Sequence, residues 1–229
     1  MTYFKQIYTL VRKDLLNELR TKEMLSAMFV FAFLVIVIFA FAFYEPSKEI
    51  MRGAFPGIIW VGFTFAGIQG LNRAFMAEKS NDCLMGLLLA PMDRTVIYFG
   101  KVIANLIFMF IMELVSLPLF FILLDFKFSG SLGLFILIIA LGTLGFVSVG
   151  TFLAALSSNT RTSEILLPIL VFPILVPVLL GAVKATGLIL NVANANDLAM
   201  YWQWIKLIGV YDAVFLAVPF ILFDFVMEV

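Results

Sequence analysis

The sequence contains no histidine and only one cysteine, Cys83. The missing histidine removes the commonest metal ligand and the usual general base, and it excludes Ser-His-Asp and Cys-His catalytic arrangements. A single cysteine forms neither an intrachain disulfide nor a cysteine-based metal site. The phosphate-binding motif G-x-x-x-x-G-K-[ST] is also absent, so no usual nucleotide site is encoded. We therefore expect a protein that is not an enzyme and binds no cofactor or metal itself.

Charge is scarce as well. Only 13% of the residues are charged and the formal net charge is zero, whereas about a quarter of the residues in a soluble domain are charged. A neutral chain has no basic surface for nucleic acid. In contrast, 63% of the residues are apolar, 26 of them are phenylalanine, and the mean hydropathy is +1.11. This composition is typical of a membrane protein.

The apolar residues form long continuous runs, and a run of about 20 residues is enough for a helix to cross a bilayer. We predict six spans, at residues 25–44, 54–76, 96–124, 132–156, 165–183 and 205–226. Continuous runs indicate helices, because the strands of a membrane barrel alternate apolar and polar residues. The prediction is an all-α integral membrane protein with one transmembrane domain over residues 1–229 and no cleavable signal peptide.

The basic residues near the span ends indicate the orientation, since they accumulate on the cytoplasmic side. The predicted topology places ten of them on the side of the N-terminus and five on the other. We therefore expect both termini, the loop after the second span and the loop after the fourth span in the cytoplasm.

Two further segments have an amphipathic or aromatic character. Residues 2–22 repeat apolar residues at helical spacing, at Phe4, Tyr8, Val11, Leu15 and Leu19, as in a helix that lies in the headgroup plane. The alternative is a simple basic anchor. Residues 184–206 combine asparagines with Tyr201, Trp202 and Trp204, and we expect an external interfacial helix or loop there.

The cytoplasmic loop of residues 78–91 begins with polar residues and continues into leucines, and Pro91 disfavours helix at the residue before it. A short helix that exposes leucines in such a place needs a groove on a partner. The alternative is a loop whose leucines dip into lipid.

This loop resembles the coupling helix of ABC-2-type transporter permeases, which reads roughly E-R-E-x-G-T-L-E-x-L-L-x-x-P. The matching residues are Glu78, Leu84, Leu87, Leu88 and Pro91, and the resemblance implies that they contact an ATPase. Asp82, Cys83 and Met85 stand where that family has Gly, Thr and Glu.

Other stretches resemble the haem exporter membrane subunit of cytochrome c maturation, the CcmB family. They are the P-G-I-I-W run of residues 56–60, the L-N-R-A-F run of residues 71–75, residues 141–155 of the fourth span, and the prolines of the fifth span with their neighbours in 166–179. Together with the coupling loop they occur in the family's order along nearly the whole chain. Asn105 replaces a histidine of the family.

The resemblance implies a permease subunit in the bacterial inner membrane that works with two cytoplasmic ATPase subunits and a second copy of itself. It also implies a haem-handling membrane protein, a small membrane polypeptide and a periplasmic haem chaperone as partners. ATP hydrolysis in the partner would drive haem export or release of the loaded chaperone. Two rival hypotheses are an ABC-2 permease for a polysaccharide, lipid or drug, and a membrane scaffold without an ATPase.

Two charged residues within the spans are candidate functional positions. Glu113 lies near the middle of the third span, where an ionised carboxylate is costly unless it is paired or hydrated. It either faces the subunit interface or a translocation path, or is a neutral packing group. If it is buried against protein, we expect a bond to Asn105, Ser116 or a group on a second copy of the chain. Arg73 ends the second span and is either a snorkelling anchor or an ion-pair partner of Glu78 or Asp82.

The small residues and prolines of the spans have packing roles in the prediction. Gly142, Gly145 and Gly150 in the fourth span allow close helix approach. Pro168, Pro173 and Pro177 are expected to kink or break the fifth span, because each removes a backbone donor.

Overall fold

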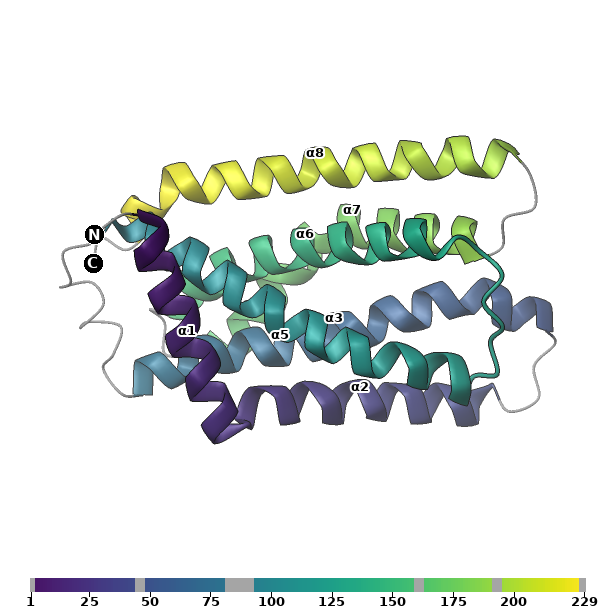
Figure 1. Cartoon of the computed structure of the whole chain (residues 1–229), viewed down its shortest axis with the longest axis horizontal. Coiled ribbons are helices and arrows are strands. Elements are labelled where there is room, and N and C mark those ends of the chain that lie inside the picture. Colours follow the sequence, from purple (N-terminus) through teal and green to yellow (C-terminus); the bar gives the residue numbers. More distant parts are fainter. Residues whose placement is uncertain (1–2, 44–47, 81–92, 159–162, 191–194, 227–229) are drawn as a thin grey trace.

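The computed structural model is a bundle of long helices with one shorter helix across its end (Figure 1). The structure describes residues 3–43, 48–80, 93–158, 163–190 and 195–226. Over these residues the elements are α1 (Tyr3–Thr21), α2 (Glu23–Ala42), α3 (Lys48–Ser80), α5 (Arg94–Leu123), α6 (Leu132–Ser158), α7 (Ser163–Leu190) and α8 (Ala195–Val226). The long helices lie side by side, and both chain termini lie at the end that α1 crosses (Figure 1).

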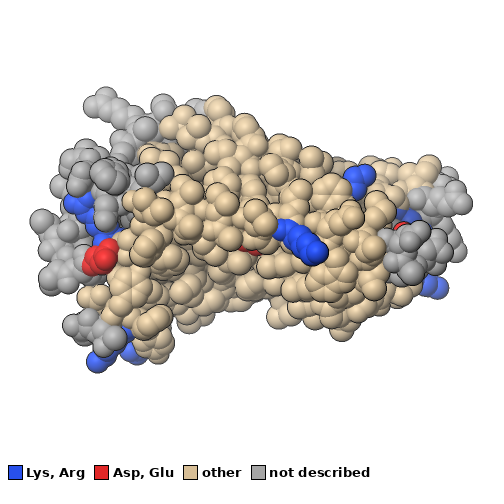
Figure 2. All heavy atoms as spheres, turned by 90° about the horizontal axis from the view of Figure 1, so that it is seen from above, with Lys and Arg blue, Asp and Glu red and all other residues tan. Residues whose placement is uncertain are grey.

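Six of the described helices are long and apolar enough to cross a membrane, namely α2, α3, α5, α6, α7 and α8. The predicted all-α membrane fold with six spans is therefore confirmed. Residues other than Lys, Arg, Asp and Glu fill most of the face in Figure 2, where charged side chains lie toward both ends and one basic side chain lies near the middle. An apolar surface of this height is what the hydrocarbon core of a bilayer requires.

The predicted external segment at residues 184–206 is wrong in its extent. α7 continues through Lys184 to Leu190, and α8 already begins at Ala195. A single lysine does not end a membrane helix, because its aliphatic stem lies along the apolar surface while the ammonium reaches the interface. Lys184 and Lys206 are both exposed helical residues of this kind.

The N-terminal helix α1 has two apolar faces. Ile7, Leu10 and Val11 are buried, and α1 packs mainly on α5. Phe4 and Tyr8, which mark the predicted membrane face, are 78% and 66% exposed. One face therefore docks on the bundle, while the other is available to the lipid headgroup region. The predicted membrane face is wrong at Val11, which is buried, because helical spacing alone does not show which apolar residues meet another helix.

The turn from α1 into α2 is stabilised by a buried carboxylate. Lys22 adopts a left-handed conformation with φ of 56° between the two helices. Glu18 is only 7% exposed, and its Oε1 accepts a hydrogen bond of 2.8 Å from the backbone N–H of Leu25. This bond satisfies one of the free N–H groups at the start of α2 and fixes the angle between the interfacial helix and the first span.

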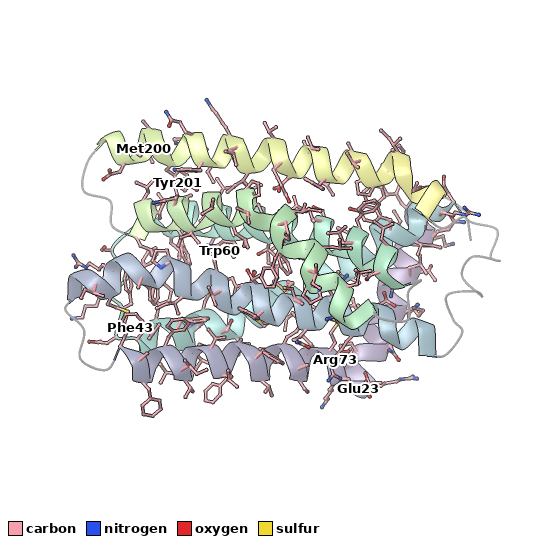
Figure 3. The ribbon with its side chains drawn as sticks, turned by 180° about the vertical axis from the view of Figure 1, so that it is seen from behind. Glu23, Phe43, Trp60, Arg73, Met200 and Tyr201 are labelled. Atoms are coloured by element: carbon pink, nitrogen blue, oxygen red, sulfur yellow. The ribbon has the colours of Figure 1, made fainter. Side chains whose placement is uncertain are left out.

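Helix α6 contacts four other spans, α3, α5, α7 and α8. Its glycines make this possible, because a Cβ at Gly142 would collide with the ring of Trp60 and one at Gly150 with Leu71. Trp60 lies on α3 on the side that faces α7 (Figure 3), and its indole N–H donates to the Thr186 hydroxyl of α7 at 3.0 Å. The small residues thus have the packing role that the sequence predicts.

The prolines of α7 do not break it, since the helix is continuous from Ser163 to Leu190. Each proline frees or weakens backbone carbonyls one turn earlier, and neighbouring groups can satisfy them. The Tyr211 hydroxyl donates to the carbonyl of Ile174, three residues before Pro177, at 2.8 Å.

At the proline of α8, a tyrosine replaces a lost backbone donor. The Tyr98 hydroxyl lies 3.3 Å from the carbonyl of Phe215, which is four residues before Pro219 and has lost its usual donor. The same hydroxyl also lies 3.1 Å from the carbonyl of Ser148. Tyr98 of α5 therefore supplies the donor that Pro219 removes.

This pairing predicts a measurable coupling between Tyr98 and Pro219. Tyr98→Phe should cost about 1 kcal/mol of stability, because a buried carbonyl loses its donor. In a Pro219→Ala background the cost should be smaller, since the introduced alanine supplies its own backbone N–H to the carbonyl of Phe215. Thermal melts of the four proteins in one detergent give the coupling, and Tyr201→Phe, whose hydroxyl bonds to Leu134 instead, is the control. Equal losses in both backgrounds would contradict this explanation.

Candidate functional site

The residues predicted to contact an ATPase are placed only in part. Leu84, Leu87, Leu88 and Pro91 lie outside the described residues, as does the predicted coupling helix. Glu78 belongs to the last turns of α3, but its side chain is not among those described. α3 ends at Ser80 and α5 begins at Arg94, and these two helix ends lie at the end of the bundle crossed by α1 (Figure 1).

The N-terminus of helix α5 is capped by a side chain. Asp93 caps α5, because its Oδ1 accepts from the backbone N–H of Thr95 at 2.9 Å and from the Thr95 hydroxyl at 2.8 Å. The Thr95 hydroxyl also lies 3.0 Å from the phenol oxygen of Tyr3 on α1. An Asp cap of this type satisfies one of the free N–H groups of the first turn, and here it also ties the helix start to α1.

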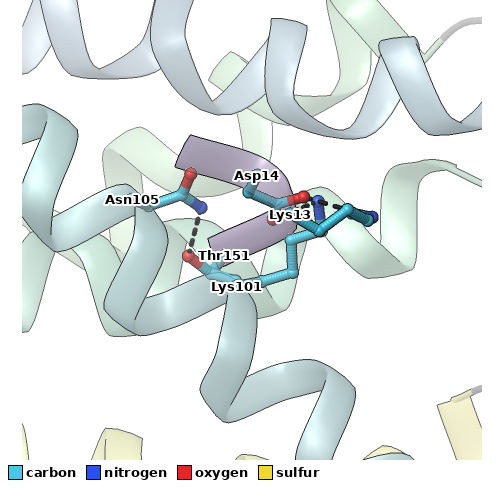
Figure 4. A network of polar contacts seen from close by, with 5 residues as sticks. All are labelled: Lys13, Asp14, Lys101, Asn105 and Thr151. Carbon is cyan, nitrogen blue, oxygen red and sulfur yellow. Dashed lines mark hydrogen bonds and ion pairs between the residues drawn. The ribbon is translucent and has the colours of Figure 1, made fainter. Parts of the chain in front are cut away.

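Two turns further along α5, a buried ion pair joins the same two helices. The Lys101 ammonium lies 2.8 Å from Oδ2 of Asp14, and their side chains are only 7% and 13% exposed. Lys13, which is largely exposed, lies 3.1 Å from the other carboxylate oxygen (Figure 4). Gly100 allows this approach, since a Cβ there would press on Leu10. The start of α5 and the interfacial helix thus form one unit.

Glu113 is buried against protein, with 2% of its surface exposed. Its Oε1 accepts a hydrogen bond of 2.5 Å from the Thr143 hydroxyl of α6, and its Oε2 has no hydrogen-bond partner among the described residues. Asn105 and Ser116 were wrongly predicted as its partners, because periodicity along one helix does not identify contacts with another. Asn105 donates to Thr151 of α6 at 3.1 Å, and Ser116 donates to the carbonyl of Met112 at 2.8 Å.

A second buried acid, Asp212 of α8, was not predicted. It is 4% exposed, and neither carboxylate oxygen has a hydrogen-bond partner among the described residues. Its carboxylate lies against the backbone of α6 at Gly145, where a Cβ would collide with it. Asp212 interrupts an apolar span just as Glu113 does, so the same search would have found it.

Thr143 and Gly145 are two residues apart, so they point to nearly opposite sides of α6. The two acids therefore flank α6, one from α5 and one from α8. An ionised carboxylate without a cationic partner is disfavoured there. An added positive charge at either position would therefore destabilise the bundle.

Arg73 is exposed near the end of α3 that lies toward α1 (Figure 3). The carboxylates predicted as its partners are not described, so the ion pair stays a prediction. Within the described part of the chain, no cluster of three or more metal-ligating acids or cysteines exists.

Comparison with known proteins identifies relatives along almost the whole chain. The family model described as CcmB protein matches residues 5–226. A protein named heme exporter protein B from Rhodobacter capsulatus is 30% identical over 190 residues, which cover 82% of this chain and 84% of the relative. Heme exporter protein B from Bradyrhizobium diazoefficiens is 25% identical over 177 residues, covering 77% and 79% of the two chains.

Proposed function

Because this chain belongs to the CcmB family, we propose that it is the membrane subunit through which ATP hydrolysis drives a late step of haem delivery to c-type cytochromes. The observation that carries this proposal is the match to the family over residues 5–226. Two relatives named heme exporter protein B support it, as do the six helices suited to span a membrane. The membrane is the bacterial inner membrane, with both termini in the cytoplasm.

ATP hydrolysis in this proposal takes place on a partner subunit, because the sequence lacks a phosphate-binding loop. Two cytoplasmic ATPase subunits pair with two copies of this chain, and residues 78–91 dock on the ATPase. The remaining partners are a haem-handling membrane protein, a small membrane polypeptide and a periplasmic haem chaperone.

The geometry supports a path for this coupling. A displacement of the docking loop reaches α5 directly, since Asp93 caps that helix immediately after the loop. The ion pair of Lys101 with Asp14 passes it to α1, and the bond from Leu25 to Glu18 passes it to α2. Capped and ion-paired helices move as rigid units rather than deforming, so the loop, the interfacial helix and two spans respond together.

Release of a loaded chaperone fits this chain better than ligation of haem within it. Haem iron needs strong axial ligands such as histidine or a cysteine thiolate, and the chain has no histidine and one cysteine. In this proposal the iron is held by other subunits and this chain supplies the motion. Purified alone, the subunit should retain no haem with the absorbance spectrum of ligated iron.

Gene deletion tests the proposed function. Loss of this protein should abolish covalent haem attachment to c-type cytochromes, detected by haem staining of gels, and a plasmid copy should restore it. Membrane b-type cytochromes, whose haem is not covalently attached, are the control. Normal levels of c-type cytochromes in the deletion strain would refute the proposal.

The docking of residues 78–91 is tested by adding charge to its leucines. Leu87→Asp combined with Leu88→Asp should eliminate ATPase co-purification while the protein still inserts, because two carboxylates are costly in an apolar groove. Leu87→Met with Leu88→Met retains the apolar surface and should bind normally. Normal ATPase binding by the aspartate variant would show that the loop is not the docking element.

A further inference from the structure

A pocket of about 310 Å³ opens between α3, α7 and α8 at the end of the bundle opposite α1. Its walls include Arg52 and Gly53 of α3, Lys184 of α7 and Asp197 of α8. The coupling path described above does not use it. It lies near the ends of three predicted spans, at the height where a bilayer changes from hydrocarbon to headgroups.

The charges of this pocket favour an anion. Two cationic side chains and one carboxylate line it, and the cations come from two different helices. Arg52 and Asp197 already take part in other polar contacts, but a guanidinium has five N–H donors and can bind an oxyanion as well. Lys184 stands six residues before the end of α7, about 9 Å from it along the helix. An acid group between the two cations would complement both.

The remaining walls are apolar and leave room for a bulky group. They include Pro56 of α3 and Leu188 of α7. A Cβ on Gly53 would meet nothing within 4 Å, and one on Gly187 would meet only Pro56, at 3.5 Å. One wall is held in place by the hydrogen bond from Trp60 to Thr186, which ties α3 to α7 next to the pocket.

We propose that this pocket binds the acid group of an amphiphile, a carboxylate or phosphate, between Arg52 and Lys184, with the apolar body against Pro56 and Leu188. Two sources of this chemistry reach the site, the propionates of haem and the headgroup of an anionic phospholipid. The haem source rests on the proposed function, whereas the acid-binding pocket itself does not. Such binding leaves the haem iron without a ligand from this chain, so the affinity is modest.

The test uses the full chain in nanodiscs of zwitterionic lipid. Haem and its dimethyl ester, whose propionates carry no charge, are titrated while tryptophan fluorescence is followed. Retention of phosphatidylglycerol by the purified protein is measured in parallel by native mass spectrometry. The variants are Arg52→Gln with Lys184→Gln, and Gly53→Leu, which fills the pocket. Lys206→Gln removes an exposed cation of α8 that does not line the pocket and is the matched control.

We expect the double glutamine variant to weaken binding about tenfold, as the loss of a charge-assisted contact predicts, and Gly53→Leu to do the same. The Lys206→Gln protein should bind like the wild type. A tenfold preference for haem over its ester assigns the pocket to propionates, and loss of phosphatidylglycerol from the variants assigns it to lipid. If neither haem binding nor lipid retention changes in the double variant, which size exclusion must show to be folded, the pocket does not bind acids.

Maturation of c-type cytochromes is measured in the same strains, which separates the two proposals. If ligand binding is unchanged in the variants while maturation still depends on the gene, only the proposal about the pocket is refuted. If ligand binding depends on Arg52 and Lys184 but maturation does not require the protein, only the proposed function is refuted.

Discussion

Replacing Glu113 by lysine is expected to prevent the protein from accumulating as a folded species. The side chain is 2% exposed and bonded to Thr143 in the centre of the bundle. An ammonium there has no carboxylate to pair with among the described contacts, and burying an unpaired charge costs several kcal/mol. Size-exclusion chromatography after mild detergent extraction should show loss of the monodisperse peak.

Glu113→Gln is the matched control, because the amide keeps the size of the side chain and accepts the bond from Thr143. It should extract as a monodisperse protein, with a melting temperature close to that of the wild type. Maturation of c-type cytochromes then decides the role of Glu113, since a packing group tolerates Gln and a proton-carrying group does not. A monodisperse Glu113→Lys protein with unchanged melting would contradict the buried position.

A separate experiment tests whether Glu113 faces protein or lipid. Glu113→Cys in a Cys83→Ser background should react poorly with a lipid-borne maleimide probe, while Leu114→Cys should react readily because Leu114 is 75% exposed. Ready labelling at position 113 would mean that the acid faces lipid.

Breaking the ion pair between α1 and α5 should have the second large effect. Lys101→Met leaves Asp14 only 13% exposed without its ammonium partner, and loss of one partner of a buried pair costs about 3 kcal/mol. The exposed Lys13 offsets part of this cost through its contact at 3.1 Å. We expect a marked fall in melting temperature and release of α1, detected as faster proteolysis after Arg12 or Arg20.

Removing both charges should restore most of the lost stability. In the double variant of Asp14→Asn and Lys101→Met, no uncompensated charge remains, and replacing a buried pair by neutral groups is often nearly neutral. If the structural coupling also transmits motion, the double variant should be stable yet mature fewer c-type cytochromes. Equal melting of the single and double variants would show that the loss does not come from the unpaired carboxylate of Asp14.

The spans were predictable because a bilayer imposes a simple rule on composition and length. The first predicted span, residues 25–44, differs from helix α2 (Glu23–Ala42) by two residues at each end. The ends of spans that carry a single charge were harder to predict. Lys184 is an example, because a lysine can stay within a helix while its ammonium reaches the interface. The fifth span was expected to kink or break, and its helix does not break between Ser163 and Leu190, because a proline removes one backbone hydrogen bond while those of the other turns remain.

Contacts between helices were not predictable from one sequence. Periodicity indicated the membrane face of α1 through Phe4 and Tyr8, but it did not identify Leu10 as the residue that packs on Gly100. Nor did it pair Lys101 with Asp14, which are 87 residues apart, or Glu113 with Thr143. A period shows which residues share a face, whereas the partner of that face depends on how all six spans pack.

Purification of the tagged protein from its native membranes tests the central claim most directly. If this chain is the membrane subunit of an ATP-driven haem delivery complex, a cytoplasmic ATPase subunit should co-purify in equal amount, and the complex should hydrolyse ATP. The Leu87→Asp and Leu88→Asp variant should yield the membrane subunit alone, without that activity. Recovery of the wild-type chain from intact membranes with no ATPase bound would contradict the account.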